Sequence, residues 1–247
     1  MTKRLAGKKA FVTGGSRGIG AAIARRLAAE GADVAITYAG NEAAANQTVA
    51  AITAADVSGF AIQADGGDPA AAARAIEAAA ERLGGIDIIV HNAGIAEFAP
   101  VGEPGGDSFE RQFALNVGGV YHGTRAAIPH LRDGGRIIII GSINAHAMPV
   151  EGGAVYGATK AAVAGLARGW ARDLGRRGIL VNVIQPGPID TDLNPADGPF
   201  GPALTAMTAL KRYGRADEVA ALAAFLASDD ASYITGAQID IDGGLTI

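Results

Sequence analysis

The chain has 247 residues, of which 49% are hydrophobic, 5% aromatic and 19% charged, a composition that allows a large buried core. Its formal charge of -4, from 21 basic and 25 acidic residues, gives no reason to expect nucleic acid as a partner. The absence of cysteine excludes a disulfide framework, a thiol nucleophile and thiolate metal sites, and it fits a cytoplasmic location.

The sequence also lacks the patterns of targeting and membrane segments. The apolar stretch at residues 10–12 is ended by Thr13-Gly14-Gly15 and is too short for the core of a signal peptide. No apolar run approaches the roughly 18 residues that a transmembrane helix needs. We therefore expect a cytoplasmic protein without a membrane partner.

Strand and helix patterns alternate along the whole chain, with glycine-rich turns between them and no linker-like break in composition. Most expected strands are continuously apolar, which strands covered by helices on both faces require. The pattern predicts one Rossmann-type domain over residues 1–247, a doubly wound three-layer α/β/α sandwich with a seven-stranded parallel sheet. The expected strands are residues 9–13, 33–38, 59–63, 86–91, 136–141, 180–184 and 237–241.

Two regions depart from this regularity. Residues 98–106 are rich in glycine and proline and predict a loop. Residues 186–202 carry five prolines and three glycines, too many for one continuous helix. Long irregular segments inside compact domains are often functional, so we expect a substrate-covering loop around residues 188–210.

A glycine-rich turn at residues 13–20 joins the first expected strand to the first helix. The spacing of Gly14, Gly18 and Gly20 allows a tight turn, close approach of the backbone to a phosphate, and close packing of helix on strand. The start of the helix then presents free N–H groups to a pyrophosphate. Because the turn opens a βαβ series, it predicts a dinucleotide site rather than an ordinary turn.

The end of the second expected strand indicates which dinucleotide binds. An NAD site normally has an acidic residue here for the ribose hydroxyls, but Tyr38 occupies the position and Glu42 lies four residues further on. Arg17 in the glycine turn can pair with a 2′-phosphate, although a solvated loop cation is the alternative. NADP(H) is therefore favoured over NAD(H).

Tyr156 and Lys160 are four residues apart, so they share one face of a helix. A phenol has a pKa near 10, and a nearby ammonium group is expected to lower it toward neutrality. Ser142 follows an apolar strand at the edge where open α/β sheets bind ligands. Alone, a Tyr/Lys pair is usually a helix surface. Together with the glycine turn and Ser142, it predicts a site where Ser142 holds a carbonyl oxygen and Tyr156 donates a proton.

In their order, these motifs resemble those of the short-chain dehydrogenase/reductase family over nearly the whole chain. The resemblance implies that Asp65 contacts adenine, although Gly66 replaces a usual apolar residue after it, and that Asn116 positions a proton-relay water. The implied catalytic residues are Asn116, Ser142, Tyr156 and Lys160. The implied cofactor-binding residues are Gly14, Ser16, Arg17, Gly18, Ile19, Gly20, Tyr38, Asn41, Asp65, Asn92, Ala93, Gly94, Tyr156, Lys160, Pro186, Gly187, Ile189 and Thr191.

The same resemblance implies a reaction. NADPH would deliver hydride to a carbonyl carbon, while Lys160 would lower the pKa of Tyr156 and hold the nicotinamide ribose. The chain is similar to 3-oxoacyl-carrier-protein reductases and broad ketone reductases, which implies a homotetramer with its catalytic helix packed on a twin. We expect a small apolar carbonyl or alcohol substrate in a cleft lined by Phe98, Ile143, Met148, Val150, Phe200, Leu204 and Met207.

A second function stays open. Residues 187–192 and 194–199, together with residues 37–40, resemble bacterial family members described as cyclic-di-GMP-binding biofilm-dispersal proteins. On that interpretation the fold serves as a signal-binding module, although the intact Ser142, Tyr156 and Lys160 argue against a role without catalysis.

The histidines invite a metal hypothesis, but none pair at ligand spacing, and we expect no metal site. His91 is expected to pack at the end of a strand, whereas His146 is equally compatible with a place in the substrate cleft and with a solvated loop.

Overall fold

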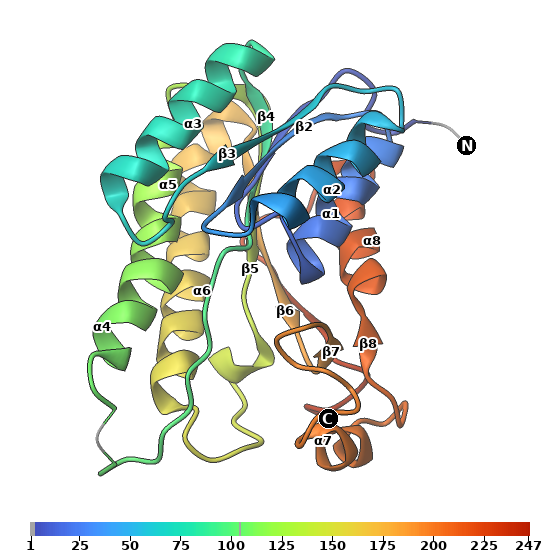
Figure 1. Cartoon of the computed structure of the whole chain (residues 1–247). Helices are drawn as coiled ribbons and strands as arrows, with labels where there is room; N and C mark the ends of the chain where they lie inside the picture. Colours follow the sequence, from blue (N-terminus) through green and yellow to red (C-terminus); the bar gives the residue numbers. More distant parts are fainter. Residues whose placement is uncertain (1–2, 104) are drawn as a thin grey trace.

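The protein is described from a computed structural model that covers residues 3–103 and 105–247; Pro104, inside the expected loop at 98–106, lies outside the described residues. Within those ranges, seven parallel strands form one sheet in the order β3-β2-β1-β4-β5-β6-β9 (Figure 1). The strand order reverses between β1 and β4, as in a doubly wound sheet, so the predicted fold class is confirmed. The strands are β1 (Lys9–Val12), β2 (Asp33–Tyr38), β3 (Gly59–Gln63), β4 (Ile86–His91), β5 (Leu131–Ile140), β6 (Leu180–Pro186) and β9 (Gln238–Ile241).

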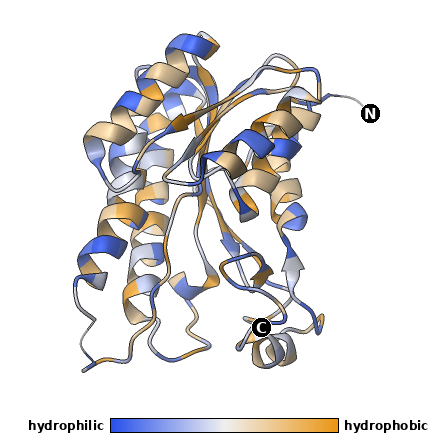
Figure 2. Ribbon diagram, in the orientation of Figure 1, coloured by the Kyte–Doolittle hydropathy of each residue, from blue (hydrophilic) through white to orange (hydrophobic). Residues whose placement is uncertain are grey.

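Helices cover both faces of the sheet. In Figure 1, α1 (Gly18–Ala29), α2 (Glu42–Thr53) and α8 (Ala216–Ala227) lie on one side, and α3 (Pro69–Leu83), α5 (Gly119–Ala127) and α6 (Ala154–Leu174) lie on the other. Alternate residues of a strand enter the two resulting cores: Ala10 and Val12 of β1 belong to one, and Phe11 to the other. Figure 2 shows the mostly hydrophobic strands enclosed between these helix layers.

The helix ends follow the local chemistry of the sequence. Asn41 caps α2 by accepting a hydrogen bond from the N–H of Ala44, and Asp68 caps α3 through the N–H of Ala70. Pro69 occupies the first turn of α3, where its missing N–H costs nothing, and Gly84 ends that helix in the left-handed conformation. These caps fix where the helices begin relative to the carboxyl ends of the strands.

Strand β5 is longer than expected, because it begins at Leu131 rather than at residue 136. Leu131 pairs with Ile86, and the register then shifts before Arg136 pairs with Ile88. The intervening Arg-Asp-Gly-Gly stretch is typical of a turn, so the sequence pattern missed this irregular start. The other expected strands agree with the structure to within two residues.

The expected substrate-covering loop has more regular structure than its prolines indicate. Within it, β7 (Ile189–Asp190) pairs with β8 (Gly214–Arg215), and α7 (Gly201–Met207) forms a short helix with Pro202 in its first turn. As expected, no long helix spans residues 186–202. In the described part of the chain, no helix has both the length and the apolar character needed to cross a membrane.

The remaining short elements connect these layers. They are α4 (Ser108–Phe113), the π-helical turn η1 (Ala114–Gly118) that joins α4 to α5, and the 3-10 turns η2 (Ile143–Ala145), η3 (Gly175–Arg177) and η4 (Asp229–Ala231).

Candidate functional site

The glycine turn can form only because its glycines have no side chains. Gly14 and Gly18 have φ angles of +63° and +53°, in the left-handed region that favours glycine. A Cβ on Gly20 would overlap the carbonyl oxygen of Gly14 and the side-chain amide of Asn92. The turn therefore lets the start of α1 approach the ends of β1 and β4 more closely than any other residues would allow.

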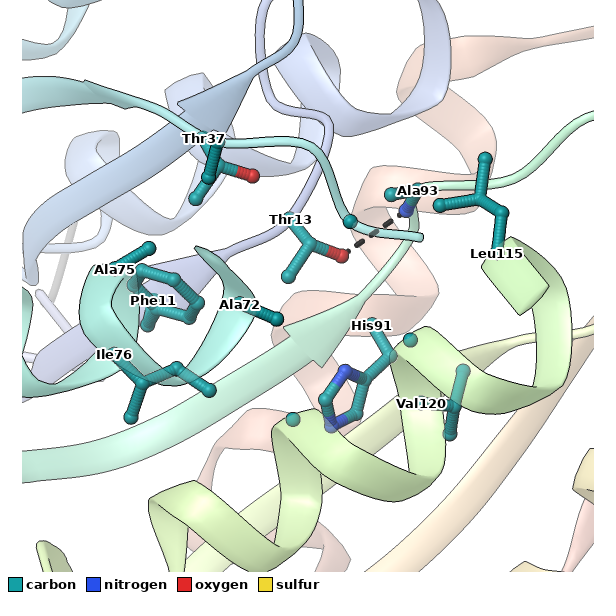
Figure 3. Close-up of a pocket in the computed structure, with 14 residues that line it drawn as sticks. Phe11, Thr13, Thr37, Ala72, Ala75, Ile76, His91, Ala93, Leu115 and Val120 are labelled. Atoms are coloured by element: carbon teal, nitrogen blue, oxygen red, sulfur yellow. Dashed lines mark hydrogen bonds between the residues drawn. The ribbon is translucent and has the colours of Figure 1, made fainter. Parts of the chain in front are cut away.

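Asn92 and Thr13 tie this turn to the end of β4. The Asn92 Nδ2 donates to the carbonyl oxygens of Thr13 and Gly14 at 3.1 and 3.0 Å. The Thr13 Oγ1 accepts hydrogen bonds from the backbone N–H groups of Asn92 and Ala93, both at 3.0 Å, and Figure 3 shows the second of these. The strand-end motif at residues 92–94 and the glycine turn thus form one rigid unit at the point where the strand order reverses.

The end of β2 lies next to the same turn. The Thr37 Oγ1 accepts a hydrogen bond from the N–H of Gly14 at 3.1 Å, and the Thr48 Oγ1 donates to the carbonyl of Ser16 at 3.2 Å. Arg17 and Asn41 are exposed, whereas Tyr38 is half-buried. The end of β2 carries no carboxylate, and the exposed Arg17 guanidinium offers a phosphate group a positive charge on the glycine turn.

Gly66 is explained by its neighbours. A Cβ at this residue would lie 2.9 Å from Cδ1 of Leu115, and a Cβ at Gly119 would lie 2.7 Å from the Gly66 carbonyl oxygen. Leu115 therefore occupies space that a side chain at residue 66 would need. The Asp65 carboxylate accepts a hydrogen bond from the N–H of Gly67 at 2.9 Å, which orients it toward the following turn.

Beneath this region is a cavity of about 30 Å³, enough for about one water molecule, that reaches His91 (Figure 3). The Nε2 of His91 lies 2.9 Å from the Thr124 hydroxyl, and burial lowers the His91 pKa to about 4. His91 is therefore neutral and packs at the strand end, as expected.

Asn116 lies within the π-helical turn η1 and is almost fully buried. Its Oδ1 accepts from the N–H of Ile95 at 2.9 Å, and its Nδ2 donates to the Ile95 carbonyl at 2.8 Å and to the Thr159 hydroxyl at 3.1 Å. A Cβ on Gly94 would lie 3.1 Å from this Oδ1 and 3.5 Å from Nζ of Lys160. The structure thus brings Asn116, Gly94 and Lys160 together.

Ser142, Tyr156 and Lys160 also converge, at the carboxyl end of β5. Ser142 caps η2 and exchanges hydrogen bonds with Asn144: its Oγ accepts from the backbone N–H at 3.2 Å and donates to Oδ1 at 3.1 Å. The Nζ of Lys160 lies 5.6 Å from the centre of the Tyr156 ring and donates to the Ile140 carbonyl at 2.9 Å.

The pKa of Tyr156 differs from the sequence-based expectation. Burial raises it above the ordinary value of a phenol, and a hydrogen bond with Ser142 only partly opposes this effect. The expected lowering by Lys160 is wrong for this structure, because the ammonium group is directed at Ile140 and is itself penalised by burial. Burial lowers the pKa of Lys160 to about 8.

The segment after β6 closes the site from the other side. A Cβ on Gly187 would lie 2.7 Å from Cα of Asp242, so Gly187 is held against the end of β9. Ile189 is buried in β7, and the Thr191 side chain lies 3.5 Å from the position of a Cβ on Gly18. The segment Pro186–Thr191 therefore reaches the glycine turn through Thr191, and its cofactor role stays a prediction.

Most of the apolar side chains expected to line the cleft are at least partly exposed, and one of them, Phe98, lies next to Tyr156. The ring of Phe98 lies 5.8 Å from that of Tyr156, centre to centre. Phe98, Met148, Phe200 and Met207 are exposed, and Val150 and Leu204 are half-buried. Ile143 is a correction, because it is buried and presents no surface to a substrate.

His146 lies in the loop after η2 with its side chain 41% exposed, and its Nε2 lies 3.3 Å from Oδ2 of Asp240 on β9. A place in the substrate cleft stays a prediction. Two polar residues that the sequence analysis missed contact Ser142, namely Asn144 and Gln185. Gln185 lies just beyond the expected strand at 180–184, and the structure extends that strand to Pro186 and so includes it.

Known proteins resemble the chain along nearly its whole length. A family model described as Enoyl-(Acyl carrier protein) reductase matches residues 14–246. The Cyclic-di-GMP-binding biofilm dispersal mediator protein of Escherichia coli is 46% identical over 96% of both chains, and versicolorin reductase stcU of Emericella nidulans is 40% identical over 98% of this chain and 96% of the relative. A short chain dehydrogenase from Burkholderia cenocepacia, solved in complex with NADP, is 48% identical, covers 99% of this chain and 100% of its own, and has a TM-score of 0.97.

Proposed function

Because the chain belongs to the short-chain dehydrogenase/reductase family of oxidoreductases, we propose that it is an NADPH-dependent reductase that acts on a ketone or secondary alcohol. The observation that carries this proposal is the convergence of Ser142, Tyr156 and Lys160 beside the glycine turn. A signal-binding module has no need for an acid, a hydroxyl and an ammonium group at one strand end.

The glycine turn and the start of α1 fit the cofactor. The backbone N–H groups at the start of α1 would hold the pyrophosphate, where Gly14, Gly18 and Gly20 leave room for it. Arg17 would pair with the 2′-phosphate, and this pairing makes NADPH the preferred cofactor. When bound, the nicotinamide supplies the hydride. A Burkholderia cenocepacia relative of the same fold was solved with NADP, which supports the assignment.

Tyr156 would donate the proton to the alkoxide that develops as hydride arrives. Its raised pKa keeps the phenol protonated at neutral pH, which suits an acid in the direction of reduction. Ser142 would hold the carbonyl oxygen, Lys160 would hold the ribose, and Asn116 would support a water that returns the proton. General acid catalysis of this kind is worth roughly 100-fold to 10,000-fold in rate.

The exposed side chains beside Tyr156 favour a small apolar carbonyl substrate. Phe98 lies beside the phenol, Met148 lies near Gly153 and Gly157 at the start of the same helix, and Phe200 and Met207 are exposed on the expected substrate-covering loop. These groups bury apolar surface without offering a charge, so they favour ketones over carboxylated substrates.

A homotetramer is the assembly that we propose. The face of α6 that carries Ala161, Gly165, Arg168 and Gly169 is exposed, and no described atom lies within 4 Å of a Cβ built on either glycine. A helix from a second copy can approach such a face closely. Sedimentation velocity of the purified protein tests this assembly.

Cyclic-di-GMP binding is the second candidate function, and it rests on the name of the Escherichia coli relative. Both candidates are tested by one experiment on purified protein. NADPH oxidation is followed over a panel of ketones, and cyclic-di-GMP binding is measured by calorimetry. Absence of oxidation over the whole panel, together with tight cyclic-di-GMP binding, contradicts the reductase proposal.

Replacing Tyr156 by phenylalanine tests the proposed acid. We expect Tyr156→Phe to lower kcat by at least about 1000-fold, because the ring stays in place but its proton is lost. NADPH binding, measured by fluorescence titration, should change by less than about threefold. If the variant turns over ketones at a comparable rate, another group supplies the proton.

A further inference from the structure

Gln185 is a buried polar residue that contacts Ser142. It stands next to last in β6 and is 0% exposed. Its Oε1 accepts a hydrogen bond from the backbone N–H of Ser142 at 2.6 Å. A buried amide side chain in an apolar strand is costly unless its hydrogen bonds are made, so this contact satisfies groups on both sides.

Gly141 makes the contact possible. A Cβ on Gly141 would overlap Oε1 of Gln185, and it would also lie 2.8 Å from Cγ1 of Val183. A side chain on the residue before Ser142 would therefore push the Gln185 amide away. The absence of a side chain at Gly141 therefore lets the Gln185 amide reach the N–H of Ser142.

The hydrogen bond between Ser142 and Gln185 also connects β5 to β6 beyond the last backbone hydrogen bond of the two strands. The last ladder bond runs from the N–H of Gly141 to the carbonyl of Ile184, at 2.7 Å. The next would need an N–H from Pro186, which has none. The side chain of Gln185 instead joins the two strands through another group, the N–H of Ser142, at the point where the chain leaves the strand.

The other end of Gln185 reaches the edge strand. Its Nε2 donates to Oε1 of Gln238 on β9 at 3.3 Å. The neighbouring β9 residue on the same face, Asp240, stands opposite Gln185 in the register and lies 3.3 Å from His146. The segment from Ser142 to His146 is thus attached to β6 at its start and to β9 at its end.

We propose that Gln185 is a positioning residue that fixes Ser142 for catalysis. The backbone of Ser142 is held by Gln185, and its hydroxyl is held by Asn144, so the two contacts together determine where the Oγ lies. Displacement of a catalytic group by about 1 Å can cost about 100-fold in rate. This inference rests on the proposed reductase function, in which Ser142 holds the carbonyl oxygen.

The test replaces Gln185 by methionine, which has a similar length but offers no comparable acceptor. Asn182→Leu is the matched control. Asn182 is a buried amide on the same strand, and it bonds to Ile234 and Ala237 but not to Ser142. Both variants lose buried hydrogen bonds, so both are expected to lose stability, and only the first changes the surroundings of Ser142.

We expect Gln185→Met to lower kcat roughly 10-fold to 100-fold, and Asn182→Leu to lower it less than about threefold. The decisive measurement is a double-mutant cycle. In a Ser142→Ala background, Gln185→Met should lower the residual rate by less than about threefold, because the group that it positions is gone. Equal losses in both backgrounds would show a general structural effect and overturn the proposal.

A second measurement does not depend on activity. Amide hydrogen exchange in a peptide that covers residues 141–148 should speed up in Gln185→Met and stay unchanged in Asn182→Leu. Unchanged exchange in Gln185→Met contradicts the proposal even if the rate falls. If the native protein reduces no carbonyl, the proposed function fails, and the exchange result still decides whether Gln185 holds Ser142.

Discussion

The carboxyl edge of the sheet has two halves, at β1–β4 and at β5–β6, whose shapes depend on different interactions. On the β1–β4 side, a turn of closely packed glycines is held by the side chains of Thr13 and Asn92, and Gly20 leaves no space for a single added carbon. On the β5–β6 side, the edge consists of buried side chains held by hydrogen bonds, among them Ser142 and Gln185. The first half suits close contact with a phosphate, and the second suits the orientation of reacting groups.

This difference predicts opposite sensitivities. Adding atoms should damage the β1–β4 half, because its geometry depends on empty space. Removing polar atoms should lower the activity of the β5–β6 half, because the orientation of its reacting groups depends on hydrogen bonds. Gly20→Ala and Lys160→Met each change one half, and Phe98→Ala changes the exposed apolar surface outside both.

Gly20→Ala should have the largest effect. The new Cβ would overlap the Gly14 carbonyl and the Asn92 amide, so the glycine turn must open. We expect NADPH affinity to fall by at least about 100-fold and the free energy of unfolding to fall by about 1–3 kcal/mol. Fluorescence titration and thermal unfolding measure the two effects.

Gly175→Ala is the control for this variant. Gly175 has a φ of -58°, and no described atom lies within 4 Å of a Cβ built on it. Alanine should therefore be tolerated without loss of stability. If both alanine variants bind NADPH like the native protein, the β1–β4 half does not depend on empty space.

Lys160→Met should have the next largest effect, on stability. Burial lowers the Lys160 pKa from 10.5 to about 8, so between these values the unfolded chain holds a proton that the folded chain does not. The buried charge therefore destabilises the fold below about pH 8, and this penalty disappears as the pH rises toward 10.5. Methionine should raise the free energy of unfolding by about 1–3 kcal/mol at pH 7 and by less at pH 10.

Chemical denaturation at a series of pH values checks this difference. Lys211→Met is the control, because the Nζ of Lys211 also donates to a carbonyl, that of Ala206, but from an exposed position. A constant difference between Lys160→Met and the native protein from pH 7 to 10.5 would contradict the prediction. A fall in the activity of Lys160→Met, together with a rise in its free energy of unfolding, would strengthen the contrast between the two halves.

Phe98→Ala should have the smallest effect. Phe98 is 50% exposed, and its ring, 5.8 Å from that of Tyr156 centre to centre, carries no hydrogen-bonding atom. We expect KM for an apolar ketone to rise about 3-fold to 10-fold with little change in kcat, because only binding surface is lost. Val101→Ala, at a fully exposed residue of the same loop, should leave both constants unchanged.

The sequence predicted the β1–β4 half better than the β5–β6 half. Glycine spacing is local information, so the turn at Gly14, Gly18 and Gly20 was visible in a few consecutive residues. The seven-stranded sheet followed from the alternation of apolar runs in the same way. The start of β5 was missed, because a shift in register depends on the partner strand.

The contacts around Ser142 could not be predicted from the spacing of residues in the sequence. Gln185 lies 43 positions from Ser142 in the chain, and only the pairing of β5 with β6 brings them together. The sequence pattern also could not predict that the Tyr156 pKa is raised, since this shift depends on how deeply the ring is buried and where the Lys160 ammonium points. The assigned roles of these residues stay predictions until the variants are measured.

The π-helical turn at η1 makes the chain intolerant of changes in length at this point. Five residues, Ala114–Gly118, take a wider turn than an α-helix, and α5 continues directly from them. A π-helical turn holds one residue more than an α-helical turn, so deleting one residue here would collapse the wide turn to α-helical geometry. Asn116, which lies in this turn, would then lose its hydrogen bonds to Ile95 and Thr159. A designer who shortens or recombines this protein should therefore place no crossover between Phe113 and Gly119.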